Sequence, residues 1–181
     1  IMDKNKSLVI NLFSGPGVGK STACAGIFYE LKKRHYNVEL VTEYAKDIVF
    51  ENRQELFTDQ LYILAKQHRR ILRLSGKVDI ILTDSPILQN LAYTPDSYFR
   101  SYAPLVRDVF DSFHNVNFLL KRRTEYVQTG RYQSEEDAMK LDGIVWKPAV
   151  FKQPLHNRID NIEHSLPDMI GVIVNEHASN A

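Results

Sequence analysis

A glycine-rich segment directly after an apolar run is the feature that most constrains how this chain can fold. Residues 13–22 read FSGPGVGKST and combine three glycines, a lysine and a hydroxyl pair. Backbone N–H groups can wrap closely around phosphate only where side chains do not obstruct the bend, and glycine meets that need. The pattern predicts a phosphate-binding loop with these nucleotide-binding residues: Ser14, Gly15, Pro16, Gly17, Val18, Gly19, Lys20, Ser21 and Thr22.

The lysine and the hydroxyls of this loop have separate predicted roles. Lys20 is expected to reach the β- and γ-phosphates of ATP, and Ser21 is expected to hold Mg²⁺. A helix that begins near Gly19 would direct its positive N-terminal end at the same phosphates. The first glycine of the usual spacing is replaced by Ser14, and we expect Gly15 to take over its conformational role.

The rest of the chain alternates apolar strand runs with longer helical patterns, which predicts right-handed βαβ units and a parallel sheet. The expected strands are residues 7–13, 37–42, 77–83, 116–120 and 169–175. The expected fold class is therefore α/β, a P-loop NTPase fold with a five-stranded parallel sheet flanked by helices, formed by a single domain over residues 1–181.

Composition limits the partners of this domain. Of the 181 residues, 44% are hydrophobic and 25% are charged, and no apolar run approaches the roughly 18 residues of a membrane span. We expect a cytoplasmic protein with no membrane partner, and the net charge of +1 neither demands nor excludes nucleic acid. The single cysteine, Cys24, is expected to be a buried apolar residue.

Two carboxylates follow predicted strands, Glu43 after residues 37–42 and Asp84 after residues 77–83. The carboxyl ends of parallel strands border the ligand crevice, so both are catalytic candidates. Asp84 is expected beside Mg²⁺, with Ser21, and either carboxylate could accept a proton from a hydroxyl. The alternative for Glu43 is a charge that stabilises the start of the next helix. Ser85 stands where a water-polarising glutamate would follow Asp84, which favours transfer to a hydroxyl.

Residues 57–75 form an amphipathic pattern. An apolar side is predicted for Leu61, Ile63, Leu64, His68, Ile71, Leu72 and Leu74, and a basic side for Lys66, Arg69, Arg70 and Arg73. Two amides, Gln60 and Gln67, lie within the apolar stripe, where they need either backbone partners or the edge of a base. The basic side is either a solvated face or a contact to phosphates of a nucleic acid.

Aromatic and arginine residues supply further acceptor-side candidates. Residues 93–107 interleave tyrosines and a phenylalanine with arginines, which fits a stacking platform for bases or, alternatively, core packing of a helix pair. The predicted substrate-binding residues are Tyr44, Phe50, Arg53, Gln60, Gln67 and Tyr98.

A polar loop after residues 116–120 is the predicted lid, over about residues 121–134. Arg123 and Arg131 are expected to neutralise charge on the transferring phosphoryl group, with surface solvation as the alternative. Ser134 followed by Asp137 is a capping-box pattern, so a helix is expected to start at about Glu135.

Together these segments resemble a known family. The motifs are FSGPGVGKST, VTEYAKDIVFENR, DQLYILAKQ, ILTDSP and YVQTGRYQSEEDA, and the resemblance extends over about residues 7–143. They are similar to the small phage-encoded P-loop kinases that are grouped with thymidylate kinase and with the kinase domain that phosphorylates nicotinamide riboside. The phage 5-hydroxymethyluracil DNA kinases are the most similar in function.

This resemblance implies an ATP- and Mg²⁺-dependent kinase with a nucleoside-kinase-like fold. It implies that residues 15–22 bind ATP and Mg²⁺, that Glu43 and Asp84 flank the acceptor hydroxyl, and that Arg131 belongs to the lid. The implied acceptor is the hydroxymethyl group of 5-hydroxymethyluracil in DNA. Two alternatives stay open, a kinase for a free nucleoside or nucleotide and a non-catalytic nucleotide-binding switch.

Overall fold

The computed structural model describes residues 7–122, 134–145, 157–159 and 162–180. The strands are β1 (Leu8–Phe13), β2 (Val38–Val41), β3 (Ile80–Thr83), β4 (His114–Leu120) and β5 (Asn157–Ile159). The helices are α1 (Lys20–Lys33), α2 (Tyr44–Phe50), α3 (Gln60–Leu72), α4 (Tyr102–Asp111), α5 (Glu135–Val145) and α6 (Ile162–Asn180), with two short 3₁₀ helices, η1 (Gln54–Thr58) and η2 (Ile87–Tyr93).

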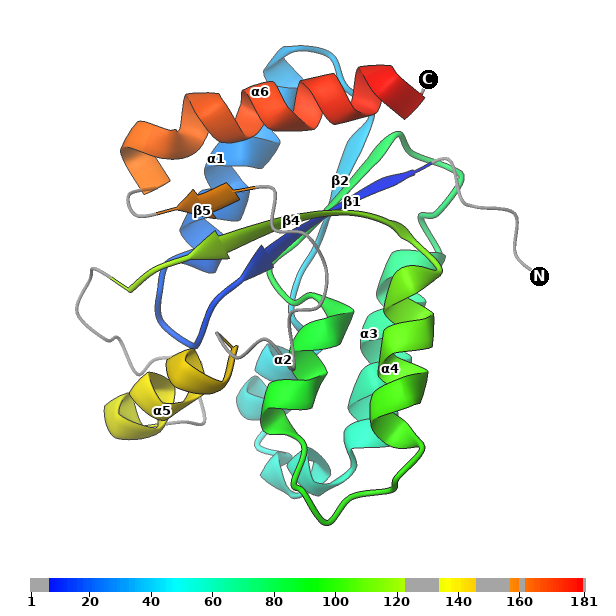
Figure 1. Ribbon diagram of the computed structural model, residues 1–181, viewed down its shortest axis with the longest axis vertical. Coiled ribbons are helices and arrows are strands. Elements are labelled where there is room, and N and C mark those ends of the chain that lie inside the picture. The colour runs from blue at the N-terminus through cyan, green and yellow to red at the C-terminus, as the bar shows by residue number, and fades with distance from the viewer. Residues whose placement is uncertain (1–6, 123–133, 146–156, 160–161, 181) are drawn as a thin grey trace.

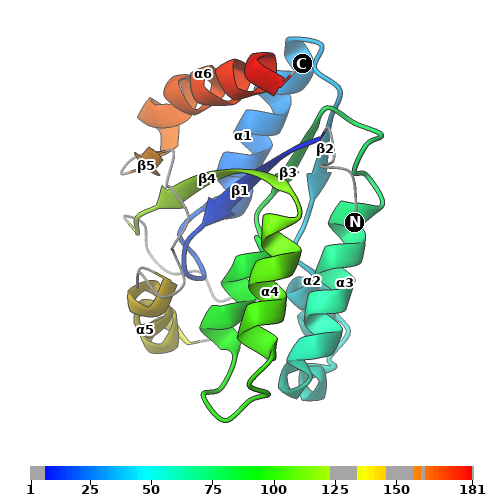
Figure 2. The same cartoon turned by 45° about the vertical axis from the view of Figure 1, so that its right-hand side comes forward.

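The strands form one five-stranded sheet in the order β2-β3-β1-β4-β5, and each neighbouring pair is parallel. Helices α1 and α6 cover one face, while α3 and α4 lie side by side against the other (Figures 1 and 2). The α/β class and the parallel sheet flanked by helices are thus as the sequence predicts.

Strand β1 passes through the centre of the sheet and supplies both hydrophobic cores. Leu8, Ile10 and Leu12 face α1 and α6, whereas Val9 and Phe13 pack with residues of α3 and α4. Because side chains alternate along a strand, a continuous apolar run is what burial on both faces requires. The phosphate-binding segment therefore begins at the end of a strand that is packed on both faces of the sheet.

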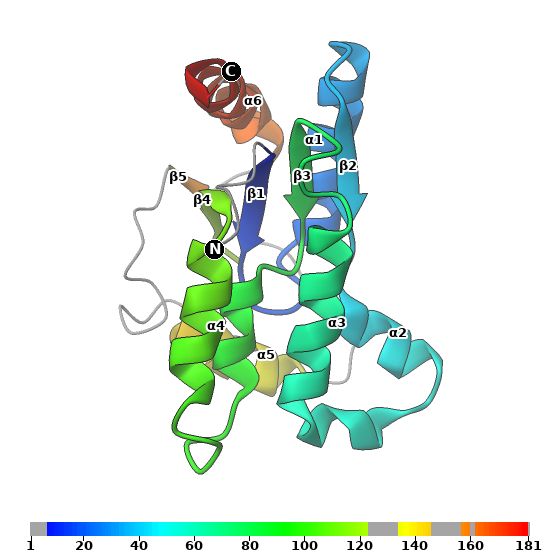
Figure 3. The same ribbon diagram turned by 90° about the vertical axis from the view of Figure 1, so that its right-hand side faces the viewer.

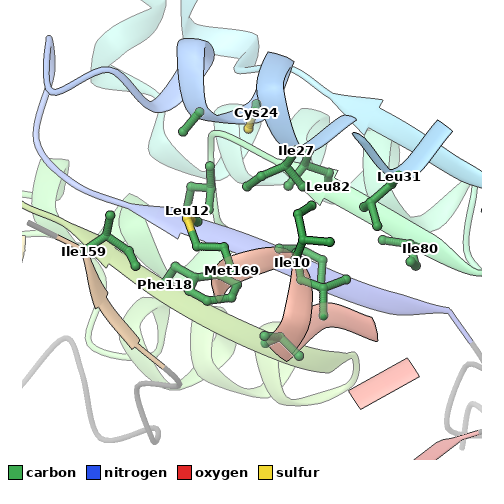
Figure 4. Close-up of a cluster of buried hydrophobic side chains, with 14 of the residues drawn as sticks. Ile10, Leu12, Cys24, Ile27, Leu31, Ile80, Leu82, Phe118, Ile159 and Met169 are labelled. Carbon is green, nitrogen blue, oxygen red and sulfur yellow. The ribbon is translucent and has the colours of Figure 1, made fainter. Parts of the chain in front are cut away.

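The core between the sheet and α1 contains Cys24, which is 1% exposed and belongs to the same buried cluster as Leu12 (Figure 4). Burial raises the pKa of its thiol well above the ordinary value. The prediction of a buried, apolar cysteine is confirmed.

The predicted strand at residues 169–175 is wrong, because this segment belongs to α6. Met169, Ile170 and Ile173 are buried in the core next to α1, at a spacing that places them on one side of a helix. A short β-branched apolar run cannot distinguish a buried strand from a buried helix. The fifth strand is instead β5, which pairs with β4 and was not predicted.

The predicted helix over residues 57–75 is shorter, and its two faces differ in part from the expectation. It begins at Gln60 after Asp59, whose carboxylate accepts the Tyr62 N–H at 3.0 Å as an N-cap. Leu61 is 40% exposed and does not belong to the apolar side. Arg70 is half-buried and engaged, since it donates to the Thr42 carbonyl at 3.1 Å and pairs with Asp47.

The capping box before α5 is confirmed. Ser134 Oγ accepts the Asp137 N–H at 3.2 Å and donates to Asp137 Oδ2 at 2.8 Å. Within the described ranges, no helix is both long enough and apolar enough to cross a membrane.

Candidate active site

A cleft of about 270 Å³ opens at the carboxyl ends of β1, β2 and β3. These three strands are neighbours, and Figure 3 shows α2 beyond the ends of β2 and β3, next to α3. The end of the cleft at the phosphate loop is lined by Pro16, Gly17, Gly19, Lys20, Ser21 and Thr22. This position is the crevice at which open α/β sheets bind their ligands.

The phosphate loop owes its bend to two glycines. Gly17 has φ 77° and Gly19 has φ 100°, which only glycine adopts without strain. Ser14 and Gly15 are not among the described residues with positive φ, so Gly15 does not take over a special conformation as expected. Serine is tolerated at position 14 because the backbone there is ordinary; its buried hydroxyl donates to the Gly15 carbonyl at 3.0 Å.

Lys20, the first residue of α1, folds back over the loop. Its ammonium donates to the carbonyl oxygens of Ser14 at 2.9 Å and Gly15 at 3.0 Å. A second cation reaches the loop from the end of β4, since Arg122 Nη2 donates to the Pro16 carbonyl at 2.6 Å. Sequence reasoning chose the next residue, Arg123, and Arg131 instead, and both lie outside the described residues.

Asp84 meets the loop from the end of β3. The carboxylate is 2% exposed, and its Oδ2 accepts from Ser21 Oγ at 2.8 Å and from Lys46 Nζ at 3.0 Å. Oδ1 is buried and has no hydrogen-bond partner among the described residues. An orphaned carboxylate oxygen beside a hydroxyl is a donor set that suits Mg²⁺, a hard cation with oxygen ligands, so Ser21 and Asp84 fit the predicted metal.

Glu43 is the N-cap residue of α2, but its side chain makes no capping hydrogen bond. It lines the cleft instead, near Lys46 and the loop. Because β2 and β3 are adjacent, Glu43 and Asp84 follow neighbouring strand ends, as the sequence predicts.

The two amides of the α3 stripe both line the cleft, and they differ in their bonding. Gln67 is satisfied by backbone: its Oε1 accepts the Tyr44 N–H at 3.0 Å, and its Nε2 donates to the Thr42 carbonyl at 3.4 Å. Gln60 donates to the Phe57 carbonyl at 2.8 Å, which leaves its buried Oε1 without a partner among the described residues. Gln67 thus joins α3 to the start of α2, and the side-chain oxygen of Gln60 can still accept a hydrogen bond.

The other predicted substrate-binding residues lie outside this cleft. Tyr44 turns to Tyr62, with their hydroxyls 3.0 Å apart, and burial raises its pKa to about 12. Phe50 is 68% exposed and borders a second cavity of about 260 Å³ that also touches Glu43. Arg53 pairs with Glu51 at 3.4 Å on the surface.

Tyr98 supports α3 and α4 and does not line the cleft. Its hydroxyl accepts the Leu61 N–H at 3.2 Å, and its ring lies 5.0 Å from that of Tyr102. Tyr102 is 2% exposed, and burial raises its pKa to about 12. The core-packing explanation therefore accounts for these two tyrosines, whereas Tyr93 does line the cleft.

Sequence reasoning missed most of the acceptor end of the cleft, where Val49, Phe57, Ile63, Gln89 and Asn90 join the lining, and it missed Lys46 at the phosphate end. Gln89 is 4% exposed, and its Oε1, like that of Gln60, has no partner in the described part of the chain. The one available signal was the position of Lys46 in the first turn after Glu43; residues 87–93 form a 3₁₀ helix without an amphipathic pattern.

Known structures have the same architecture at low sequence identity. NadR in complex with NR has a TM-score of 0.68 at 16% identity, over 91% of this chain and 51% of NadR. Thymidylate kinase from Ehrlichia chaffeensis has a TM-score of 0.59 at 18% identity, over 92% and 98% of the two chains. Deoxyadenosine kinase from M. mycoides has a TM-score of 0.56 at 20% identity, over 94% and 99%.

These likenesses establish the fold, a P-loop NTPase fold of the nucleoside-kinase type. A search of curated protein sequences returns no match. A family model described as an AAA domain matches residues 9–146, which is more than half of the chain and includes the phosphate loop, Glu43 and Asp84. The chain therefore belongs to this AAA domain family.

Proposed function

We propose that the protein transfers the γ-phosphoryl group of ATP to a hydroxyl of a nucleoside-type acceptor. The observation that carries this proposal is the cleft itself, which joins the phosphate loop and Glu43 to an uncharged acceptor end, with Asp84 bonded to Ser21 of the loop. The resemblance of the fold to nucleoside and nucleotide kinases supports the same class of reaction.

The residues at the phosphate end would position the triphosphate of ATP and neutralise its negative charge. Lys20 and the N–H groups of the loop would bind the triphosphate, while Ser21 and Asp84 would hold Mg²⁺. The bound Mg²⁺ would neutralise charge on the phosphates during transfer. From the predicted lid, Arg123 and Arg131 would add positive charge and exclude water.

Glu43 is the proposed proton acceptor. The acceptor oxygen forms a bond to the γ-phosphorus as the bond from that phosphorus to the β–γ bridging oxygen breaks; ADP leaves, and the hydroxyl proton passes to Glu43. Asp84 is less suited to this role because its Oδ2 already accepts two hydrogen bonds at the loop. Glu43 follows the neighbouring strand end and lines the cleft directly.

The acceptor end favours a neutral base or nucleoside. Its lining is apolar or aromatic at Val49, Phe57, Ile63 and Tyr93, with the neutral amides of Gln60, Gln67, Gln89 and Asn90. The charged residues that line the cleft in the described part of the chain, Lys20, Glu43 and Lys46, belong to the phosphate end. The orphaned oxygens of Gln60 and Gln89 call for N–H donors, which nucleobases supply. A nucleoside fits this lining better than a nucleoside monophosphate.

Two sources of such an acceptor are proposed. The first is 5-hydroxymethyluracil in DNA, which the resemblance to the phage kinases implies. Exposed Lys66, Arg69 and Arg73 of α3 could contact its phosphates, whereas Arg70 is engaged by Asp47. The second is a free nucleoside, a class represented among the similar structures by a deoxyadenosine kinase and by NadR with NR.

One assay distinguishes these acceptors. The protein is incubated with γ-labelled ATP and, separately, duplex DNA with 5-hydroxymethyluracil, the same duplex with thymine, the free 5-hydroxymethyl nucleoside, nicotinamide riboside and thymidylate. Label in the modified duplex alone supports the DNA acceptor, and steep loss of that label with salt would implicate α3. Label in a free nucleoside supports the second source. Absence of label in every acceptor would overturn the kinase proposal in favour of a nucleotide-binding switch.

The proton acceptor is tested by Glu43→Gln. We expect kcat to fall by about 10²- to 10⁴-fold while ATP binding stays unchanged. A variant with full kcat would exclude Glu43 from this role.

A further inference from the structure

The ammonium of Lys46 contacts both of the side chains that would hold Mg²⁺. Lys46 Nζ donates to Ser21 Oγ at 2.7 Å and to Asp84 Oδ2 at 3.0 Å, and these are the two side chains that suit Mg²⁺. We propose that Lys46 is an internal cation that holds this position until Mg·ATP arrives, and that its displaced ammonium then binds the transferring phosphoryl group. This inference rests on the proposed function for its second step alone.

The charge of the site supports the first step. Asp84 is 2% exposed and contributes one negative charge, which the ammonium of Lys46 balances at 3.0 Å. A divalent cation and an ammonium cannot share one position, because their repulsion is strong in a site with little water. Free Mg²⁺ must therefore displace the Lys46 ammonium from Asp84 with no other anion to receive it. ATP, in contrast, brings negative charges that attract both cations. Metal and nucleotide are thus expected to enter together.

Lys46 is free to move because other contacts hold α2. The first turn of α2 is held by two contacts, the hydrogen bond from the Tyr44 N–H to Gln67 Oε1 and the ion pair of Asp47 with Arg70. The side chain of Lys46 is 31% exposed, while its partner Asp84 is 3% exposed. Lys46 is therefore bonded to the metal-binding pair and is not required to anchor its own helix.

The second step follows from where Lys46 lies in the cleft. It lines the same cavity as Lys20 and Glu43, on a flexible four-carbon side chain. Glu43, the N-cap residue of α2, is the proposed proton acceptor, so the reacting phosphoryl group is expected to lie between the loop and the start of α2. A cation there would stabilise charge on the phosphoryl oxygens during transfer.

The metal step is tested without nucleotide or acceptor. Binding of Mn²⁺, a paramagnetic substitute for Mg²⁺, is followed by loss of the free-ion EPR signal for wild type, Lys46→Met and Lys46→Arg. We expect Lys46→Met to bind Mn²⁺ about tenfold more tightly than wild type, because it exposes the Asp84 carboxylate to the metal, and Lys46→Arg to stay near wild type. Adding Asp84→Asn to Lys46→Met should abolish the gain.

A matched control is Lys32→Met, because Lys32 also pairs with a carboxylate, Glu39 at 3.3 Å, on the far part of α1. It should leave Mn²⁺ affinity unchanged. Circular dichroism establishes that each variant is folded. Equal Mn²⁺ affinity in folded Lys46→Met and wild type would overturn the first step, whatever the outcome of the kinase assay.

The phosphoryl step is tested by turnover with whichever acceptor takes the label. We expect Lys46→Met to lower kcat by about 10²-fold with little change in the KM for the acceptor. Full kcat in this variant would overturn the second step. If no acceptor is labelled by wild type, the kinase proposal fails separately and the metal result still stands.

Discussion

Gln67 on α3 accepts the backbone N–H of Tyr44 at 3.0 Å and so holds the first turn of α2 from outside that helix. The first N–H groups of a helix have no partner within it, and here a neighbouring helix supplies one. Glu43 and Lys46 flank this tether in sequence, and both line the cleft. A side chain of α3 thus positions the start of α2, which carries the proposed proton acceptor and Lys46.

Replacing Gln67 by methionine should therefore affect both stability and activity. The variant leaves a buried N–H unpaired, and we expect the free energy of unfolding to fall by about 1–3 kcal/mol. Urea denaturation measures this change, with Gln54→Met in η1 as a control for loss of a less buried amide. We also expect a lower kcat, because Glu43 and Lys46 lose their support. Equal stability of the two variants would contradict the tether.

Lys20→Ala should abolish ATP binding and phosphoryl transfer while the fold survives. Its ammonium donates to the loop carbonyls at positions 14 and 15, so its removal is expected to alter the loop and to leave the sheet and its helices in place. Calorimetric titration with ATP and far-UV circular dichroism measure the two effects. Lys33→Ala, at the other end of α1, is the control. Full activity of Lys20→Ala would exclude the phosphate-loop assignment.

The loop should tolerate change at position 14 better than at position 19. Gly19 has φ 100°, so Gly19→Ala forces a side chain into a left-handed backbone, at a cost of about 1–2 kcal/mol. Ser14→Gly alters no such constraint and should keep most ATP affinity. Thermal unfolding and ATP titration of both variants test this order, and a reversal would mean that Ser14 determines the shape of the loop.

Acid should destabilise the protein through His68. Burial lowers the pKa of His68, whose ring lies against that of Phe113, below its ordinary value of 6.5, so the unfolded chain binds a proton more readily than the folded protein. Stability from this group is present above pH 6.5 and is lost as pH falls below it. Denaturant unfolding is measured from about pH 7.5 to about pH 5, a range that brackets the ordinary pKa of histidine. Over this range the free energy of unfolding should decline less steeply for His68→Leu than for wild type. An unchanged slope would contradict the assignment.

Local patterns were sufficient for much of the fold. The phosphate loop, the strands before and after it and the capping box at Ser134 each depend on a few consecutive residues, and all were predicted. The run at residues 169–175 was misassigned because its apolar letters suit a buried strand and a buried helix equally well. The packing of this segment against α1 depends on tertiary structure, which the local sequence pattern does not show.

The sequence by itself determined the phosphate end of the site, since glycines, lysine and hydroxyls act there through neighbouring backbone, and strand ends deliver Glu43 and Asp84. The tertiary structure decided the acceptor end and the position of Lys46. Gln60 comes from α3, Gln89 and Tyr93 come from η2, and Lys46 meets Asp84 across 38 positions of the chain. Such contacts depend on how helices pack on the sheet, and periodicity within one segment carries no information about its neighbours in space.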